Sequence, residues 1–239
     1  MLGHLLEFAV HAEPAAETLA FYEALGFESL PVVGSQGGPY AAMSNEITLG
    51  LRAEPLDGPV PVFVRPNLKM HLRGLRHLGI DLELAALADD EFNRAAFRDP
   101  NGRLVMLVEA RSFSPAPPAP QRVFACGRFL EWSVATHSIA ESEAFWAALG
   151  MRTIAEGTAP HSWLRMAGRG LAVGFHETAR FSSALTFTAP GVGARIEYLR
   201  AKHLRLQDGA PVAVAGESAA TMTLPERTLA YLLDRALQR

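Results

Sequence analysis

The sequence of 239 residues predicts an α+β protein made of two similar units, and three observations support this fold class. First, the stretch from Leu6 to Gly26 occurs again, 124 residues later, from Leu130 to Gly150. Second, each copy has the pattern of a strand followed by a helix. Third, short alternating segments separated by turn residues follow each copy, which is typical of hairpins. The repeat therefore predicts two units of about 120 residues, each large enough to be a domain.

The repeated stretch opens with a strand and continues as a helix. In residues 5–10 apolar and polar side chains alternate, with Phe8 on one face and Glu7 on the other. A glycine closes each copy and is the expected end of the helix. In the second copy, Ser138 and Glu141 have the spacing of a capping box at the start of the helix.

The other elements follow from apolar alternation, helical spacing and turn residues. In the first half we expect a helix over residues 67–78 and strands over 40–44, 47–52, 60–64, 95–98 and 103–108. In the second half we expect a helix over 194–203 and strands over 161–166, 171–176, 185–188, 221–223 and 229–233. The proline-rich residues 111–122 are the expected stiff linker between domain 1–110 and domain 123–239.

Composition excludes several classes of protein. The net charge of −3 gives no reason to expect a nucleic-acid partner. The basic residues of the helix over 67–78 fit a solvated helix face; they are Lys69, His71, Arg73, Arg76 and His77. A single cysteine, Cys126, excludes an internal disulfide and a zinc site made of several thiolates. Without a signal peptide pattern or a membrane-length apolar run, we expect a cytoplasmic protein with no membrane contact.

Three segments together carry a resemblance to a known family. A strand followed by a helix that ends in FYEALGF or FWAALGM, and a closing hairpin FRDPNGRLVMLVE, resemble the vicinal oxygen chelate superfamily. That superfamily includes glyoxalase I, bleomycin-resistance proteins and extradiol dioxygenases. The resemblance covers nearly the whole chain, although the second half has TLPERTLAYLLD in place of the family's DPxG turn. It implies four βαβββ modules paired into two glyoxalase-like open-barrel cups, as in two-domain dioxygenases.

The resemblance also implies where a metal would be held, on the concave side of each cup. Its ligand positions fall on residues that match between the two halves: Glu7 and Glu131 in the first strands, Gly50 and Gly174 in the middle strands, Met106 and Tyr231 in the closing strands. Each cup thus retains one carboxylate, and a single carboxylate does not hold a transition metal against water. We therefore expect a lost metal site and no other cofactor.

Period-two alternation predicts the residues that line each cup. Glu7 and Glu131 are candidate catalytic carboxylates, because a carboxylate whose pKa is raised in an apolar cup can act as a general base. The candidate ligand-binding residues are Tyr40, Arg52 and Met106 in the first cup, and Ser133, Trp163, Arg165, His176 and Tyr231 in the second. The second cup is the more polar and aromatic of the two, and it is the preferred site.

Each candidate also has a purely structural interpretation. Glu131 can pair with Arg165, and Glu7 with Arg52, as buried ion pairs without chemistry. His176 fits a rim residue exposed to water.

Three functions therefore stay open. The first is a metal-free protein that binds a small molecule in a concave pocket. The second is a metal-dependent lyase, isomerase or extradiol-type dioxygenase. The third is a structural or regulatory protein whose cups are filled by their own side chains. A monomer and a homodimer are equally compatible with the sequence.

Overall fold

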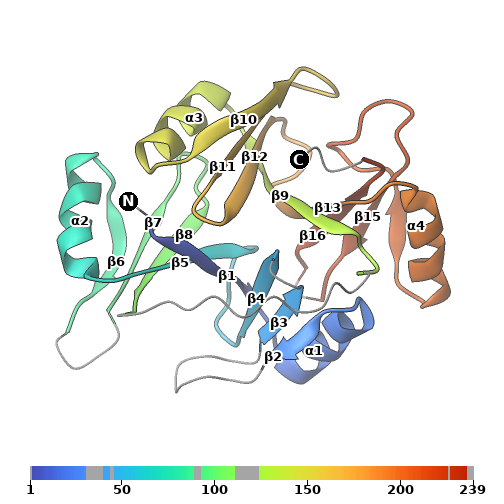
Figure 1. Cartoon of the computed structure of the whole chain (residues 1–239), viewed down its shortest axis with the longest axis horizontal. Helices are drawn as coiled ribbons and strands as arrows, with labels where there is room; N and C mark the ends of the chain where they lie inside the picture. The colour runs from blue at the N-terminus through green and yellow to red at the C-terminus, as the bar shows by residue number, and fades with distance from the viewer. Residues whose placement is uncertain are drawn as a thin grey trace.

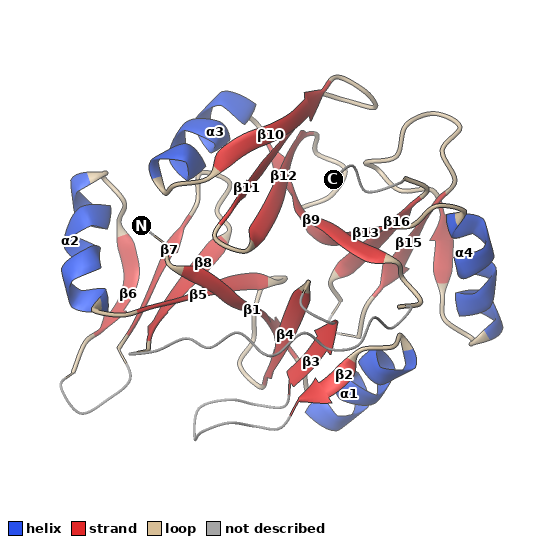
Figure 2. Cartoon of the chain, viewed as in Figure 1, coloured by secondary structure: helices blue, strands red, loops and turns tan. Residues whose placement is uncertain are grey.

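The computed structural model describes residues 2–30, 40–43, 46–88, 93–110, 124–225 and 227–235, which form two sheets with two helices each (Figures 1 and 2). The first half consists of β1 (His4–His11), α1 (Ala15–Ala24), β2 (Glu28–Leu30), β3 (Tyr40–Met43), β4 (Ile47–Arg52), β5 (Val60–Arg65), α2 (Leu68–His77), β6 (Leu82–Ala86), β7 (Arg94–Arg98) and β8 (Leu104–Glu109). The second half consists of β9 (Arg128–Thr136), α3 (Ile139–Ala148), β10 (Arg152–Gly157), β11 (Trp163–Gly168), β12 (Leu171–Glu177), β13 (Ser183–Thr188), α4 (Val192–Ala201), β14 (Leu206–Asp208), β15 (Ala219–Thr223) and β16 (Leu229–Leu233).

Each sheet has eight strands and is made of two βαβββ modules. The order is β2-β3-β4-β1-β5-β8-β7-β6 in the first sheet and β10-β11-β12-β9-β13-β16-β15-β14 in the second. The modules meet where their first strands pair antiparallel, β1 with β5 and β9 with β13. This architecture confirms the predicted α+β fold class with four modules paired into two cups.

The four strands that the sequence pattern misses are the outermost strands of the sheets: β2, β6, β10 and β14. Residues 82–86 and 152–157 are mostly exposed or half-buried, without a buried face. An edge strand of this kind lacks the alternation on which strand prediction depends. The predicted central strands and helices agree with the structure to within a few residues, and the helix predicted over 194–203 begins at Val192.

Local signals at helix ends and turns are confirmed. The hydroxyl of Ser138 accepts a hydrogen bond from the backbone N–H of Glu141 at 3.2 Å, which is one half of the predicted capping box. The N–H of Ser138 donates to Thr136 Oγ1 at 3.1 Å and not to the side chain of Glu141. The turn after β7 is closed by a hydrogen bond from the N–H of Gly102 to the carbonyl oxygen of Asp99. The expected linker over residues 111–122 lies outside the described residues, so the division into domains 1–110 and 123–239 stays a prediction.

One hydrophobic core runs from the first half into the second. Phe8 of β1 contacts Trp132 of β9 edge-on, with ring centroids 6.0 Å apart, and Trp146 of α3 packs on Trp132 from the other side. The opposite faces of the sheets carry smaller apolar clusters, around Val62 in the first cup and around Tyr231 in the second. The faces that carry the two glutamates therefore point away from the shared core and into the cups.

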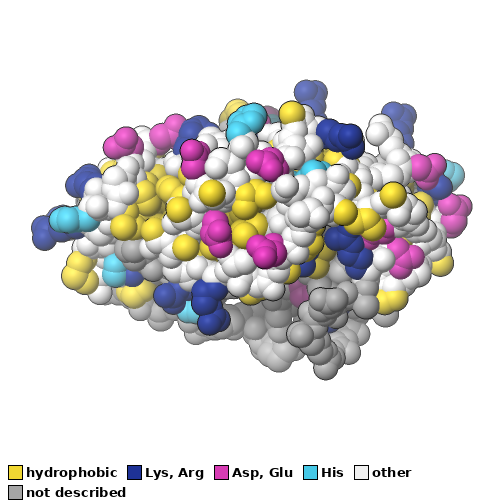
Figure 3. All heavy atoms as spheres, turned by 90° about the horizontal axis from the view of Figure 1, so that it is seen from above, with side chains coloured by type: hydrophobic (Ala, Val, Ile, Leu, Met, Phe, Trp, Pro, Cys, Tyr) yellow, Lys and Arg dark blue, Asp and Glu magenta, His cyan; other side chains and the backbone are white. Residues whose placement is uncertain are grey.

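The surface agrees with the near-neutral composition. On the face shown in Figure 3, acidic and basic side chains are both scattered around a group of hydrophobic side chains. Such a mixed face does not favour binding of a polyanion.

Within the part of the chain that is described, no helix has the length and apolar character of a membrane span.

Candidate functional site

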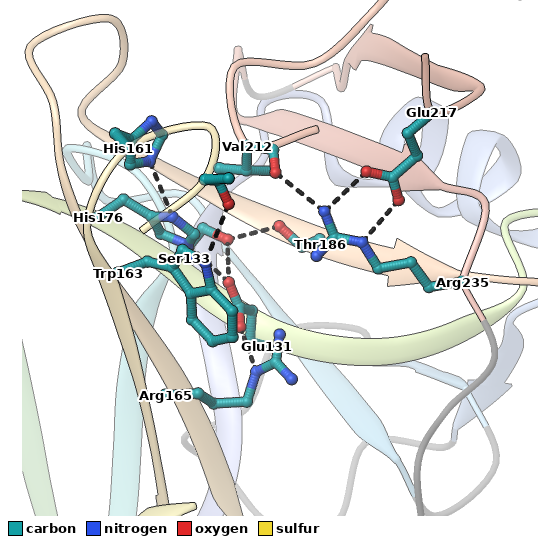
Figure 4. Close-up of polar contacts among 11 residues, drawn as sticks. Glu131, Ser133, His161, Trp163, Arg165, His176, Thr186, Val212, Glu217 and Arg235 are labelled. Atoms are coloured by element: carbon teal, nitrogen blue, oxygen red, sulfur yellow. Dashed lines mark hydrogen bonds and ion pairs between the residues drawn. The ribbon is translucent and has the colours of Figure 1, made fainter. Parts of the chain in front are cut away.

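The second cup holds a buried carboxylate that is bonded on both of its oxygens (Figure 4). Glu131 is 1% exposed. Its Oε1 accepts hydrogen bonds from Ser133 Oγ and from His176 Nε2, both at 2.8 Å. Its Oε2 accepts from Nε of Arg165. The arrangement thus surrounds one negative charge with three donors, one of them a permanent cation.

Strand register brings these side chains together. Ser133 lies two residues after Glu131 on β9, so both point to the concave face. Gly174 of β12 lies beside Ser133, and Arg165 of β11 lies beside Gly174. A Cβ atom added at Gly174 would overlap the carboxylate of Glu131. The glycine at the middle-strand position therefore makes room for the acid that projects from β9.

A second contact connects this centre with the protein surface. His161 Nε2 lies 3.1 Å from His176 Nδ1. Because a carboxylate only accepts, Nε2 of His176 carries the proton, and in the neutral ring its Nδ1 accepts from His161. His176 is 4% exposed, whereas His161 is half-buried. The pKa of His161 is lowered by burial and by the nearby charges of His176 and Arg180.

The electrostatic environment stabilises the charged form of Glu131. Burial alone raises the pKa of this carboxyl. The hydrogen bond from His176, the charge of Arg165, the charge of His176 and the hydrogen bond from Arg165 together outweigh burial. The pKa of Glu131 therefore lies well below its usual range. A carboxylate of this kind is a weak base, so the general-base role predicted for a raised pKa does not suit Glu131.

The centre approaches solvent beside Arg165 and Trp163. The guanidinium carbon of Arg165 lies 5.5 Å from the centroid of the Trp163 ring, within cation–π range. The indole N–H of Trp163 donates to the carbonyl oxygen of Ala159 at 3.1 Å, which fixes the ring. The Arg165 side chain is 17% exposed. This edge of the cup is therefore partly accessible, while Glu131 beneath it is not.

The other half of the second cup is filled by the chain itself. Tyr231 of β16 is fully buried, and its ring contacts Phe181 with centroids 5.5 Å apart. Val212, from the loop between β14 and β15, belongs to the same cluster. Arg235 holds that loop, since Nη2 donates to the carbonyl oxygen of Val212 at 3.2 Å and to Glu217 Oε2 at 2.7 Å (Figure 4).

The Tyr231 hydroxyl is buried without a hydrogen-bond partner among the described residues. Burial also raises the pKa of Tyr231. This side chain, predicted as a ligand contact, lies in the filled half of the cup and serves mainly as packing there.

The first cup has the same carboxylate with fewer partners. Glu7 is 1% exposed and pairs with Arg52 through Oε1, and its Oε2 has no partner among the described residues. Val62 and Met106 follow Glu7 across the sheet, so the surroundings are apolar. Burial raises the pKa of Glu7, although the charge and hydrogen bond of Arg52 oppose the shift. Tyr40 lies opposite Gly50 in the backbone ladder, and its side chain is outside the described part.

The predicted pairing of Glu131 with Arg165, and of Glu7 with Arg52, is confirmed. The interpretation of His176 as an exposed rim residue is wrong, because its side chain is buried and bonds Glu131.

Two contacts were missed by sequence reasoning. Thr186 Oγ1 lies 2.6 Å from Ser133 Oγ, and His161 contacts His176. Alternation along β13 could have indicated Thr186. The period of the strand predicted over 161–166 puts His161 on the same face as Trp163 and Arg165, but it gives no contact with His176, and β11 begins only at Trp163.

The paired cups define the class of fold, and comparisons with known proteins agree at that level. No protein-family model and no curated protein matches the sequence. Solved structures do match. A catechol 2,3-dioxygenase has a TM-score of 0.63 and 15% identity over 100% of this chain and 91% of its own. The 2,2',3-trihydroxybiphenyl 1,2-dioxygenase of Sphingomonas wittichii has 0.65 and 14% over 98% and 90%.

The homoprotocatechuate 2,3-dioxygenase of Arthrobacter globiformis has a TM-score of 0.64 and 13% identity over 97% of this chain and 79% of its own. At these identities the likeness establishes the fold alone. The chain thus shares the fold of these dioxygenases. The glyoxalase and bleomycin-resistance parts of the resemblance stay predictions.

The expectation that the chain takes no metal or other cofactor is contradicted by these neighbours. They are dioxygenases, and the resemblance implies a divalent metal for that class. A non-haem iron site needs two histidines and one carboxylate with open positions. Within the described ranges no three His, Cys, Asp or Glu side chains are grouped for a metal ion. Glu131 and His176 do lie together, but Arg165 already bonds the second carboxylate oxygen, so these donors do not fit such a site.

Proposed function

We propose that the protein binds a small aromatic molecule carrying an acidic oxygen at the accessible edge of the second cup. The observation that carries the proposal is the Glu131 centre: a buried, fully bonded carboxylate that holds the partly exposed Arg165 beside Trp163. The first cup supports this choice by contrast. Its glutamate, Glu7, has one side-chain partner among the described residues, Arg52, and its other neighbours are apolar.

Arg165 supplies the recognition element. Its Nε is used by Glu131, and its two terminal nitrogens have no hydrogen-bond partner among the residues that the structure describes. A guanidinium fork recognises carboxylate and phenolate oxygens with geometric specificity. The Trp163 ring lies next to it, with the guanidinium over the ring, and adds an aromatic wall to the site.

Glu131 and His176 act as positioning residues in this proposal. A carboxylate that accepts from Arg165 fixes the orientation of the guanidinium before a ligand arrives, which reduces the entropy lost on binding. His176 and Ser133 hold the carboxylate in turn.

A ring-cleaving dioxygenase is the second candidate function, and the likeness to catechol 2,3-dioxygenase over the whole chain favours it. Elemental analysis of protein purified without chelator tests it directly. Two results would favour the dioxygenase over the binding protein. The protein would contain about one equivalent of a transition metal per chain, and it would take up oxygen on adding catechol, with the uptake abolished in Glu131→Gln.

Ligand binding is tested by calorimetry with catechol and benzoate as probes. We expect saturable binding that weakens at least tenfold in Arg165→Gln, because a charge-assisted hydrogen bond contributes about 1.5–3 kcal/mol. The matched control is Arg52→Gln, which removes the corresponding partner of Glu7 in the first cup and leaves affinity unchanged. Equal losses in both variants, or no binding of either probe to the unaltered protein, would overturn the proposal.

A further inference from the structure

A loop of the second half covers part of the second cup. Residues 209–218 connect β14 to β15, and Val212 of this loop is 2% exposed. Val212 belongs to one apolar cluster with Tyr231 and Ala184, and Ala210 and Ala213 pack against the same cluster. The chain thus fills this part of its own cup with a loop.

Few hydrogen bonds tie the middle of this loop, residues 210–215, to the rest of the molecule. Nη2 of Arg235 donates to the carbonyl oxygen of Val212 at 3.2 Å. The N–H of Val214 donates to Oε2 of Glu217 at 2.9 Å, and its carbonyl oxygen accepts from the N–H of Glu217 at 3.1 Å. Among the described residues, every hydrogen bond that leaves residues 210–215 ends on Glu217 or Arg235.

Glu217 and Arg235 together form a latch for this segment. Nε and Nη2 of Arg235 donate to the two oxygens of Glu217, at 2.6 and 2.7 Å (Figure 4). Arg235 is also held from outside the loop, because its carbonyl oxygen accepts from the hydroxyl of Thr188. A bidentate pair of this kind has one preferred geometry. Its loss would free the bonds to Val212 and Val214 together.

Glycines flank the segment on both sides. Gly209 and Gly216 each have a φ of +82°, a conformation that other residues rarely adopt. A Cβ atom added at either position would meet no atom within 4 Å, so lack of space does not require these glycines. Their backbone freedom permits a change of direction at both ends of residues 210–215, as the hinges of a lid require.

In the same cluster as Val212, Tyr231 has a polar atom without a partner. Its hydroxyl is buried and unbonded among the described residues, which is unfavourable. Its ring contacts Phe181, and Phe181 contacts His176 with ring centroids 5.8 Å apart. A hydrogen-bond acceptor carried by an apolar group is therefore the chemistry that this part of the cup lacks.

We propose that residues 210–215 are a lid, which turns about Gly209 and Gly216 when the latch opens and uncovers a pocket for an aromatic ring that bears a carbonyl group. The carbonyl oxygen accepts from the Tyr231 hydroxyl, and the ring takes the place of Val212. In the closed state the lid occupies the pocket, so its opening controls entry. The proposal goes beyond the anion-binding edge at Arg165 and stands without it.

Alkylation of a thiol placed in the lid measures its opening. Val212→Cys puts a small apolar thiol at the buried position. Cys126, the one native cysteine, is buried in the shared core and serves as an internal reference. With iodoacetamide and mass spectrometry, we expect the thiol in the lid to react at least tenfold faster than Cys126, because local opening is easier than opening of the core. Equal rates would show that the lid moves only when the core unfolds and would overturn the proposal.

Loosening the latch should open the lid alone. In the Val212→Cys protein, Glu217→Gln should raise the alkylation rate in the lid at least tenfold, because charge-assisted hydrogen bonds are lost. The rate at Cys126, which reports whether the variant stays folded, should not change. The matched control is Glu197→Gln, which removes an exposed partner of Arg200 on α4 and should alter neither rate. No rise in the lid, an equal rise at both thiols, or an equal rise in both variants would overturn the proposal.

Acetophenone is the probe for the pocket, because it is neutral and carries one carbonyl group on a ring. It should raise the alkylation rate in the lid saturably, since it occupies the pocket and holds the lid open. Ethylbenzene has a similar shape without the carbonyl oxygen and should need at least a threefold higher concentration, a difference that Tyr231→Phe should remove. No acceleration by acetophenone, or equal action of the two compounds while Tyr231 is intact, would overturn the proposal.

Discussion

The two cups start from the same parts and differ in what surrounds one carboxylate. Each places a fully buried glutamate from its first strand against a glycine of its middle strand. Four matching positions around the acid carry different residues in the two cups. Given as first cup/second cup, they are Ala9/Ser133, Arg52/His176, Val62/Thr186 and Met106/Tyr231. Except at Arg52/His176, an apolar side chain in the first cup corresponds to one with a polar group in the second.

The consequence is that one buried acid has its pKa raised and the other has it lowered. Among the described residues Glu7 has one side-chain partner, Arg52, and burial outweighs the charge of that arginine. Around Glu131 the donors together outweigh burial. Burial alone therefore does not decide the charge state of a buried carboxylate; the number of donors that reach it does. The second cup is the one in which a permanent negative charge organises other residues.

The largest expected effect comes from removing that charge. Glu131→Gln leaves Arg165 and His176 facing a neutral amide in a buried site, which should reduce the free energy of unfolding by about 3–5 kcal/mol. Urea denaturation followed by circular dichroism measures it.

The matched variant in the first cup is Glu7→Gln. Because burial already disfavours the charge of Glu7, the neutral amide should change stability by less than about 1 kcal/mol, in either direction. Similar losses in the two variants would contradict the contrast between the cups.

Adding a methyl group at the two glycines tests how firmly each acid is held. In Gly174→Ala the new Cβ meets a carboxylate held by three donors, so overpacking should lower stability by about 1–3 kcal/mol. In Gly50→Ala the new Cβ meets the carboxylate of Glu7, whose one side-chain partner among the described residues is Arg52. That carboxylate can move more readily, so the loss should be smaller. Urea midpoints of both variants give the comparison, and a larger loss at Gly50 would mean that Glu7 is the more rigid acid.

Much of this fold could be predicted from the sequence, because the central strands and the helices each bury one face. Apolar alternation in β1 and β12, for example, reflects a core on one side and a cup on the other. The edge strands could not be predicted, since β6 and β10 have no buried face to leave a pattern. The two cups themselves followed from the repeat and the resemblance.

The candidate site was less accessible to sequence reasoning. Alternation along β9 placed Glu131 and Ser133 on one face, and alternation along β11 added Arg165. Alternation gives the faces on which His161 and His176 lie, but it does not show that His176 is buried or that the two rings are in contact. Such contacts depend on how neighbouring strands and the loops before them pack in three dimensions, which is set in part by the twist of the sheet.

The dependence of stability on pH should have opposite signs for the two acids. The pKa of Glu7 is higher in the folded state than in the unfolded chain, where it is about 4.3, so its contribution is present below that value and is lost as pH rises through the folded pKa. Relative to the unaltered protein, Glu7→Gln should therefore become more stable as the pH rises from the unfolded pKa towards neutrality.

For Glu131 the pKa is lowered, so its contribution is present above the unfolded value and is lost as pH falls below about 4. The destabilisation caused by Glu131→Gln should therefore be largest at neutral pH and should shrink in acid. Urea denaturation of the unaltered protein and both variants at a series of pH values provides the test. Curves of the same sign for the two variants would show that the two cups do not differ in charge state.

The smallest expected effect comes from the outer end of the second cup. His161 is half-buried and bonds His176 once, so His161→Ala should reduce the free energy of unfolding by only about 0.5–1.5 kcal/mol. The informative readout is the ring nitrogens of His176 in an NMR spectrum. Its Nδ1 resonance should move when His161 is removed, while Nε2, bonded to Glu131, should stay in place. An unchanged Nδ1 resonance would separate His161 from the Glu131 centre and confine the polar network of the second cup to its buried residues.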